Sequence, residues 1–174
     1  DTEPAGEAAK GYSAMSYNTP GNFQLIDEIR TKIYSAGKGN LKELDRVGNV
    51  MYIRGITAAV MMVEALRTSQ NKYGKGKTVT GEQMRWGLEN LNLTQAKLDA
   101  LGFKGVMRPI STSCMDHMGA AWTRIHTWNG KAWEFTSDWM QADEQILKPL
   151  VKATADKYAA EKKLTRRTGQ DCQS

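Results

Sequence analysis

Apolar residues recur at helical spacing in three long segments of the chain. The clearest run extends from about Val50 to Ser69 and places a broad apolar face along one side, formed by Ile53, Ile56, Val60, Val63 and Leu66. The same period predicts a helix over residues 23–35 and a last helix over 143–162, with apolar positions at Ile146, Leu147, Leu150, Val151 and Tyr158. Each segment is long enough to bury one face against another layer of structure.

Two shorter helices are indicated by their first residues. Thr80 followed by Gln83 has the form of a capping box, which predicts a helix from Thr80 through Leu91. A further turn or two is expected from Thr94 to Leu101, where Gly102 ends it.

Alternation of apolar and polar residues is confined to three places. Residues 11–17 alternate and predict one strand, which Asn18-Thr19-Pro20-Gly21 would end. Residues 122–128 and 131–135 predict a hairpin, with Asn129-Gly130 as a two-residue turn. Residues 103–120 and the polar tail 164–174 are expected to be irregular.

The predicted strands are too few for the predicted helices. One hairpin and one further strand make a poor sheet for so much apolar helix surface. The sequence therefore indicates an α/β protein with an incomplete sheet, and the missing strands are expected to be encoded before Asp1, whose position without a preceding Met suggests that an upstream segment was removed.

Composition excludes some classes of function. The 174 residues carry a net charge of +5, and no apolar run approaches the roughly 20 residues that a membrane-spanning helix needs. The basic residues are spread out, apart from a small cluster at 162–167, and form neither a stripe nor a nucleic-acid-binding motif. Nucleic acid is therefore not an expected partner.

The sequence holds no catalytic motif that indicates an enzyme. Nucleophile-elbow, dinucleotide and zinc-protease patterns are absent, and the phosphate-loop imitation at Gly74–Thr78 has Asn71 where its first glycine would stand. Cys114, Asp116 and His117 suggest thiol catalysis, but neighbours at such spacing rarely face one another, so a structural cysteine is favoured.

The cysteines and aromatic residues leave two alternatives each. Cys114 and Cys172 are either a disulfide, in an oxidising compartment, or two unrelated thiols, and they are too few for a zinc site. The aromatic residues of 122–139 are either a stacking platform for a sugar or base, or cross-strand packing pairs, which this spacing favours. No metal and no cofactor is expected.

Several longer runs together resemble the solute-binding proteins of branched-chain amino-acid-type ABC transporters. The runs that carry the resemblance are Val50–Ile56 with Val63–Arg67, Thr80–Glu89, Cys114–Gly119, Trp128–Lys131, Ser137–Trp139, Lys148–Val151, Tyr158–Lys162 and Asp171–Cys172. Residues 6–26 match more loosely and residues 36–49 hardly at all. The similarity covers most of the chain, and the order of the runs is more specific than any one of them.

The resemblance implies the C-terminal part of a two-lobed type I periplasmic-binding-protein fold. Residues 1–16 would be a strand of the C-terminal lobe, and residues 17–122 would complete part of the N-terminal lobe. Residues 123–174 would supply the hairpin and last helix of the C-terminal lobe, with the third hinge crossing at 122–124. The Cys114–Cys172 disulfide becomes the favoured pairing, because this subgroup carries cysteine at both positions and is exported.

The resemblance also implies ligand-binding residues at the start of the helix after the second hinge. There Tyr52 is preferred over Val50, since an aromatic ring would cover an apolar or aromatic solute, and Arg54 is a candidate partner for a carboxylate. The usual tyrosine-then-acid start is replaced here by Arg54-Gly55. This departure leaves an amino acid, an amide or an aromatic or other organic acid as candidate solutes.

The implied function is capture of a small solute by hinge closure for an ABC importer. The expected partner is an ABC permease in the inner membrane, the expected location is the periplasm, and no enzymatic activity is expected. A ligand-sensing module of the same fold in a receptor or regulator is the alternative. Self-association is also expected if apolar lobe surfaces stay exposed.

Overall fold

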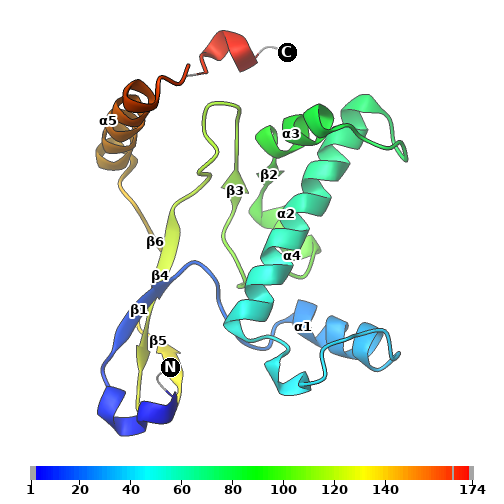
Figure 1. Ribbon diagram of the computed structural model, residues 1–174. Coiled ribbons are helices and arrows are strands. Elements are labelled where there is room, and N and C mark those ends of the chain that lie inside the picture. Colours follow the sequence, from blue (N-terminus) through cyan, green and yellow to red (C-terminus); the bar gives the residue numbers. More distant parts are fainter. Residues whose placement is uncertain (1–2, 166, 173–174) are drawn as a thin grey trace.

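The computed structural model describes residues 3–165 and 167–172, in which helices hold most of the regular structure. Figure 1 shows three parts: the helices α1 to α4 on one side, a small sheet on the other, and α5 standing apart from both. The mixture of helix and strand confirms the α/β class predicted from the sequence.

The helices begin and end close to where the sequence predicts them. Their bounds are α1 Gln24–Ile29, α2 Val50–Tyr73, α3 Gly81–Glu89, α4 Gln95–Ala100 and α5 Glu144–Lys162. A π-helical turn, η2 Arg30–Tyr34, continues α1, and the 3-10 turns are η1 Glu3–Ala9, η3 Leu44–Arg46 and η4 Gly169–Cys172. The capping box of α3 is confirmed, because Thr80 accepts from the Gln83 amide and the Gln83 side chain accepts from the Thr80 amide.

Four strands form the main sheet, and three of them pair with the fourth, β4 Trp122–Trp128. β1 Ser13–Ser16 lies on one side of β4, and β5 Trp133–Phe135 and β6 Met140–Gln141 pair with it as well, all antiparallel. A separate two-stranded ladder joins β2 Asn92–Leu93 to β3 Ile110–Ser111, which the sequence did not predict.

The prediction of a two-residue turn at Asn129-Gly130 is wrong. Trp128 pairs with Trp133, so the loop contains the four residues 129–132. The Asn129 side-chain oxygen accepts from the amides of both Lys131 and Ala132, each at 2.9 Å. The Asn129 side chain thus satisfies both amides within the four-residue loop. A two-residue turn is not needed to give them backbone acceptors.

The main core belongs to α1–α4 and the segments between them, which we call the helical body. Its fully buried side chains come from α1, α2, β2, α4 and the loops before α2 and after α4, and are Ile26, Val47, Ile53, Ala65, Leu93, Leu98 and Val106. Two helices pack closely here, because Gly87 of α3 lets the backbone approach the Ala65 carbonyl of α2. The sheet contributes none of the buried residues of this core.

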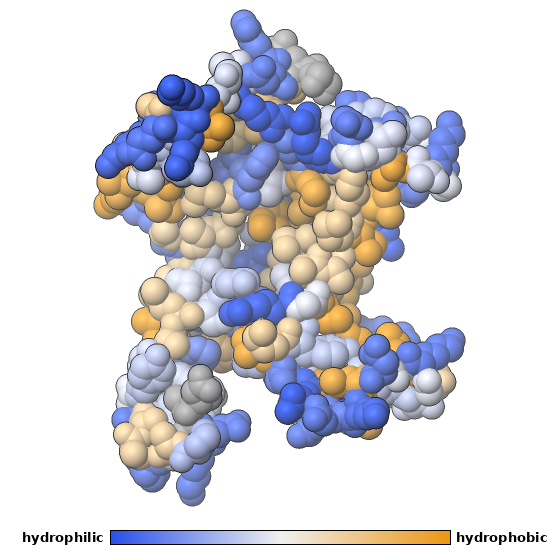
Figure 2. Space-filling view, viewed as in Figure 1, coloured by the Kyte–Doolittle hydropathy of each residue, from blue (hydrophilic) through white to orange (hydrophobic). Residues whose placement is uncertain are grey.

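Large apolar side chains remain exposed on α2 and α5. Ile146 and Leu150 of α5 are 65% and 61% exposed, and Met51, Met62 and Val63 of α2 are about half exposed or more. Figure 2 shows apolar surface gathered over α2 in the middle of this face. Part of the apolar surface of these two helices therefore has no packing partner within the described residues. None of the helices in those residues has the length and apolar character needed to cross a bilayer.

Candidate functional site

Two segments carry the chain between the sheet and the helical body, and they meet at the end of the β1–β4 ladder. Residues 16–19 leave β1 toward α1, and residues 119–123 return from β3 to β4 (Figure 1). Ser16 pairs with Arg124 at the end of the ladder, and the Thr123 hydroxyl donates to the Ser16 carbonyl at 3.4 Å. We call this pair of segments the crossing.

Buried polar groups without partners gather at the crossing. Asn18 is fully buried, and neither its side-chain oxygen nor its nitrogen has a hydrogen-bond partner within the described residues. The hydroxyls of Thr19, next to it in the chain, and of Thr57 on α2 are likewise buried and unpaired. A buried polar group without a partner costs about 1–3 kcal/mol, so these side chains are among the least satisfied of the described residues.

A cavity of about 320 Å³, the crossing cavity, opens between the crossing and α2. Tyr17 and Trp122 line it from the two crossing segments, Thr57 and Met61 line it from α2, and Arg108 and Pro109 line it from the loop before β3. Its volume is at the lower end of the range of small-molecule sites.

Two arginine side chains at the crossing lie over aromatic rings. The Arg54 guanidinium carbon is 5.5 Å from the centre of the Tyr17 ring, and that of Arg108 is 4.9 Å from the Trp122 ring. Neither arginine has a carboxylate partner among the described ion pairs, and the buried Nε of Arg108 has no acceptor. Arg108, the charged residue among those that line the cavity, therefore holds its positive charge against the face of Trp122.

The three predicted ligand-binding residues lie in the first two turns of α2 but do not converge. Val50 is the first residue of the helix, after the Asn49 cap, and Arg54 lies one turn further along beside Tyr17. Tyr52 is on the other side, packed against the core of the helical body with Tyr34. Burial, and then a hydrogen bond with Tyr34, raise the pKa of Tyr52 to about 12.

Of the residues that line the crossing cavity, the sequence singles out Trp122, as a member of the aromatic group that could form a stacking platform; Arg54 lies over Tyr17 and is not among the lining residues. Arg108 stands in a stretch with neither helical nor strand period, and Thr57 reads as an ordinary polar residue in α2. Tyr17 and Trp122 belong to predicted strands, but nothing in the sequence shows that they meet the same helix. Only the pairing of β1 with β4 brings them together.

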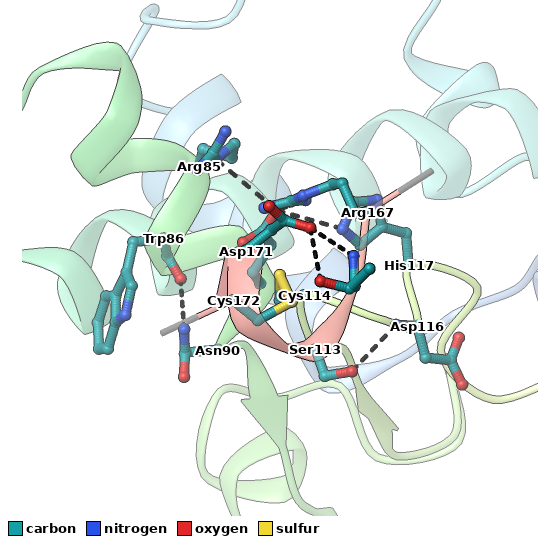
Figure 3. The surroundings of a disulfide bond; sticks show 12 residues. Arg85, Trp86, Asn90, Ser113, Cys114, Asp116, His117, Arg167, Asp171 and Cys172 are labelled. Carbon is teal, nitrogen blue, oxygen red and sulfur yellow. Dashed lines mark hydrogen bonds and ion pairs between the residues drawn. A yellow bond between two sulfur atoms is a disulfide. The ribbon is translucent and has the colours of Figure 1, made fainter. Parts of the chain in front are cut away.

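The two cysteines form the favoured disulfide, with Cα atoms 5.6 Å apart. The bond attaches the tail to the loop after β3, and η4 lies against α3 (Figure 3). Asp171 supports this tail, since its carboxylate accepts from the Thr168 amide at 2.5 Å and from the Thr168 hydroxyl at 2.9 Å. The hydrogen bond from the Thr168 amide is the main cause that lowers the pKa of Asp171.

A second attachment of the tail is the buried carboxylate of Glu89, at the end of α3. Arg167 donates to it at 2.6 Å, His117 Nε2 lies 3.3 Å away, and Arg85 Nε lies 3.7 Å away (Figure 3). The hydrogen bond from Arg167 is the main cause that holds the pKa of Glu89 below its ordinary value. Glu89 thus joins α3, the 113–117 loop and the tail.

The structure also shows the surroundings of Cys114 and His117, the candidates for thiol catalysis, and of the aromatic residues. The Cys114 sulfur is bonded to Cys172 and is no free thiolate, while His117 faces Glu89. Trp133 packs edge-on against Trp128, and its ring centre is 4.5 Å from that of His126. Trp128 is buried, and its indole N–H donates to the Gly6 carbonyl at 2.8 Å. These rings therefore pack against one another, as the strand spacing favours.

The described residues contain no group of three acidic, histidine or cysteine side chains arranged to hold a metal ion.

Two solved structures resemble the chain. One is described as an ABC transporter permease from the Pseudomonas fluorescens group; it is 41% identical over 95% of this chain, with a TM-score of 0.88. The other is a branched-chain amino acid ABC transporter from Thermus thermophilus with bound valine, 22% identical over 84% of this chain, with a TM-score of 0.59. The chain spans 40% and 38% of their respective lengths. No family model and no curated protein matches.

Proposed function

We propose that this chain belongs to the solute-binding component of an ABC importer and forms the C-terminal part of a two-lobed type I periplasmic-binding-protein fold. The observation that carries the proposal is the likeness over 84% of the chain to a branched-chain amino acid ABC transporter structure with bound valine. The likeness over 95% of the chain to a structure described as an ABC transporter permease supports the link to an ABC system. Solute binding is the activity that follows from that proposal.

The crossing supports a hinged arrangement. The buried core of the helical body contains no residue of the main sheet, and the segments 16–19 and 119–123 join the two parts and meet at Ser16 and Thr123. In a hinged binding protein, solute binds better when both lobes contact it, so it shifts the population toward the closed form. An ABC permease in the inner membrane would then recognise the closed form, and no bond chemistry is required of the chain.

The exposed apolar faces support the proposal that more β-structure belongs to the complete fold. Next to α2 lies an apolar groove of about 540 Å³, walled by Met61, Met62, Leu88, Ile110 and Met118 among others. α5 leaves Ile146 and Leu150 exposed. We propose that strands supplied by a longer polypeptide, as in the longer structures it resembles, cover these faces.

Export to the periplasm is proposed on two grounds. Disulfides persist in oxidising compartments and are rare in the reducing cytosol, and Cys114–Cys172 is such a bond. The ABC transporter proteins that resemble the chain fit the same location.

The proposal is tested by thermal-shift screening of the full-length protein against amino acids, their amides and small organic acids. A binding solute raises the unfolding temperature in proportion to RT ln(1 + [L]/Kd), which is about 2.7 kcal/mol at a hundredfold excess over Kd. A saturable shift for one solute class, confirmed by calorimetry, is expected. If no member of the panel shifts unfolding, the solute-binding function is contradicted.

A further inference from the structure

We infer that His126 makes the hairpin of β4 and β5 sensitive to pH, because proton uptake by its buried ring nitrogen weakens the packing that holds the two strands together. This sensitivity lies in the sheet and is independent of solute binding. Three features of His126 indicate it: its place in a stack of aromatic rings, its unpaired nitrogen, and the charges around it.

The imidazole of His126 packs in the hairpin beside two aromatic rings. His126 pairs with Phe135 in the ladder, and the two rings are nearly parallel, at 15°, with their centres 5.8 Å apart. The centre of the Trp133 ring is 4.5 Å from that of the imidazole. Trp133 in turn packs edge-on against Tyr12 and Trp128, with centres 6.0 Å and 5.8 Å away. The imidazole therefore cannot turn away from the hairpin without breaking this stack.

The Nδ1 atom of His126 is buried and has no hydrogen-bond partner within the described residues. A neutral imidazole carries one N–H, whereas an imidazolium carries an N–H donor on both nitrogens. Protonation therefore creates a buried, charged donor without an acceptor, which costs more free energy than an unpaired neutral atom. Burial accordingly lowers the pKa of His126 below its ordinary value.

The charge already present in the stack is positive. Arg124, two positions before His126 on β4, places its guanidinium carbon 4.1 Å from the centre of the Phe135 ring. A proton on the imidazole would bring a second cation to the same ring. Attraction between that cation and the aromatic faces is thus opposed by repulsion from Arg124.

The other elements around the imidazole bring no carboxylate to it. Glu134 alternates with the two stacked residues of β5, so its side chain points to the opposite face of the ladder. β1, Ser13–Ser16, has no charged residue. Before β1, Glu7 pairs with Lys10 at 3.4 Å. Within the described sheet, a protonated imidazole therefore finds no counter-charge.

The lowered pKa gives the pH dependence its direction. Between the pKa of His126 in the folded protein and the ordinary value of about 6.5, the unfolded chain binds more protons at this residue. Stability is therefore complete above the ordinary value and decreases as the pH falls from it toward the lowered pKa. The loss is expected in the β4–β5 ladder rather than in the helical body, whose core contains none of these rings.

The test combines urea unfolding with amide hydrogen exchange of the full-length protein at pH 7.5 and pH 5.5. Between these pH values the unfolding equilibrium constant is expected to rise about threefold more for the unsubstituted protein than for His126→Phe, which keeps an aromatic ring but takes up no proton. Protection factors of the β4–β5 amides should fall at pH 5.5 relative to those of α2, and the fall should be absent from His126→Phe and from His126→Gln. His117→Gln is the matched control and should keep the fall, because His117 lies beside Glu89 and not in the hairpin.

Equal pH dependence in the unsubstituted protein and in both His126 variants would overturn the inference, whether or not a solute binds. So would a ladder whose protection relative to α2 is the same at the two pH values, or a fall that only His117→Gln removes. Titration of the His126 ring, followed by NMR in the folded unsubstituted protein, needs no variant. It is expected below the ordinary pKa, and a ring that titrates at or above that value contradicts the inference.

Discussion

At the scale of single residues, Glu89 is the clearest case of a side chain that holds distant segments together. It is 78 positions from Arg167 in the sequence, and the pattern around it predicts only an amphipathic helix. Nothing in the sequence indicates that this acid is buried, because burial follows from the path of a tail predicted to be irregular.

We expect Glu89→Gln to lower the free energy of unfolding by about 1–3 kcal/mol, because the charge-assisted bond with Arg167 is lost at a buried position. Glu161→Gln is the control: its carboxylate is exposed and lies 4.0 Å from Lys157, so its loss should change stability by under about 1 kcal/mol. Urea unfolding measures both. Equal effects of the two substitutions would contradict the role of Glu89.

The same carboxylate predicts a dependence of stability on pH. Its pKa is lowered in the folded protein, so between that value and the ordinary value near 4.3 the unfolded chain binds more protons. The stabilisation from the Glu89 carboxylate is therefore complete at pH values above its ordinary pKa. It is lost as the pH falls through the lowered pKa of the folded protein. Urea unfolding between pH 5.5 and pH 3 should show a smaller loss for Glu89→Gln than for the unsubstituted protein; parallel curves would contradict this.

Arg54 and Tyr52, two of the predicted binding residues, lie on different sides of α2. Arg54, proposed from the resemblance, lies over Tyr17, a residue that lines the crossing cavity, and the start of α2 could be read from its apolar period. Tyr52 turns to Tyr34 instead, because a helix separates residues two positions apart by about 200° around its axis. Which side faces the crossing could not be read from α2 alone, whose apolar residues occupy more than one face.

At the scale of elements, the helices and the strands β1, β4 and β5 were predicted well because each carries its own period, cap or alternation, whereas the two-residue strand β6 was not predicted. The ladder of β2 and β3 was missed, since two-residue strands have no period to read. The hairpin loop was predicted too short, because the sequence does not show whether Asn129 serves the turn with its backbone or with its side chain.

The contact of α2 with α3 yields a prediction about two glycines. A Cβ on Gly87 would overlap the Ala65 carbonyl oxygen, so Gly87→Ala should force the helices apart and destabilise the protein by about 1–3 kcal/mol. Gly55→Ala is the matched control, because Gly55 lies in α2 with open space around it, and a better helix former there should stabilise by about 0.5–1 kcal/mol. Thermal unfolding of both variants would show opposite signs. Similar shifts in one direction would contradict the close packing.

At the scale of the whole molecule, the sequence predicts too few strands to cover the helices. The structure agrees, because α2 and α5 keep apolar side chains exposed. The position of α5 was not foreseen. Its period shows which of its faces is apolar, but what that face meets depends on chain outside the helix.

The 174-residue chain on its own is expected to self-associate through this apolar surface. Sedimentation velocity should show mass rising with concentration, and Leu150→Glu should reduce the association because Leu150 is 61% exposed on α5. Gln145→Glu introduces the same charge about 140° around the axis of α5 from Leu150 and should leave association unchanged. A chain that is monomeric at all concentrations would contradict this expectation.

Loss of the disulfide should be the largest of the stability effects predicted here. The bond joins positions 58 residues apart, so removing it by Cys114→Ser with Cys172→Ser should destabilise by roughly 4 kcal/mol in the chain-entropy model. Urea midpoints of the double variant and of the reduced protein should agree. A change below about 1 kcal/mol would show that the Glu89 contacts alone fix the tail.

The bond between Cys114 and Cys172 also turns the intervening polypeptide into a covalent ring that contains all of β4, β5, β6 and α5. The exposed Lys131 and Ala132 at the tip of the hairpin are the kind of place where a protease cuts first. Such a cut would open the ring without releasing either piece. The returning strand and the long helix would remain fastened to the helical body through the two sulfur atoms.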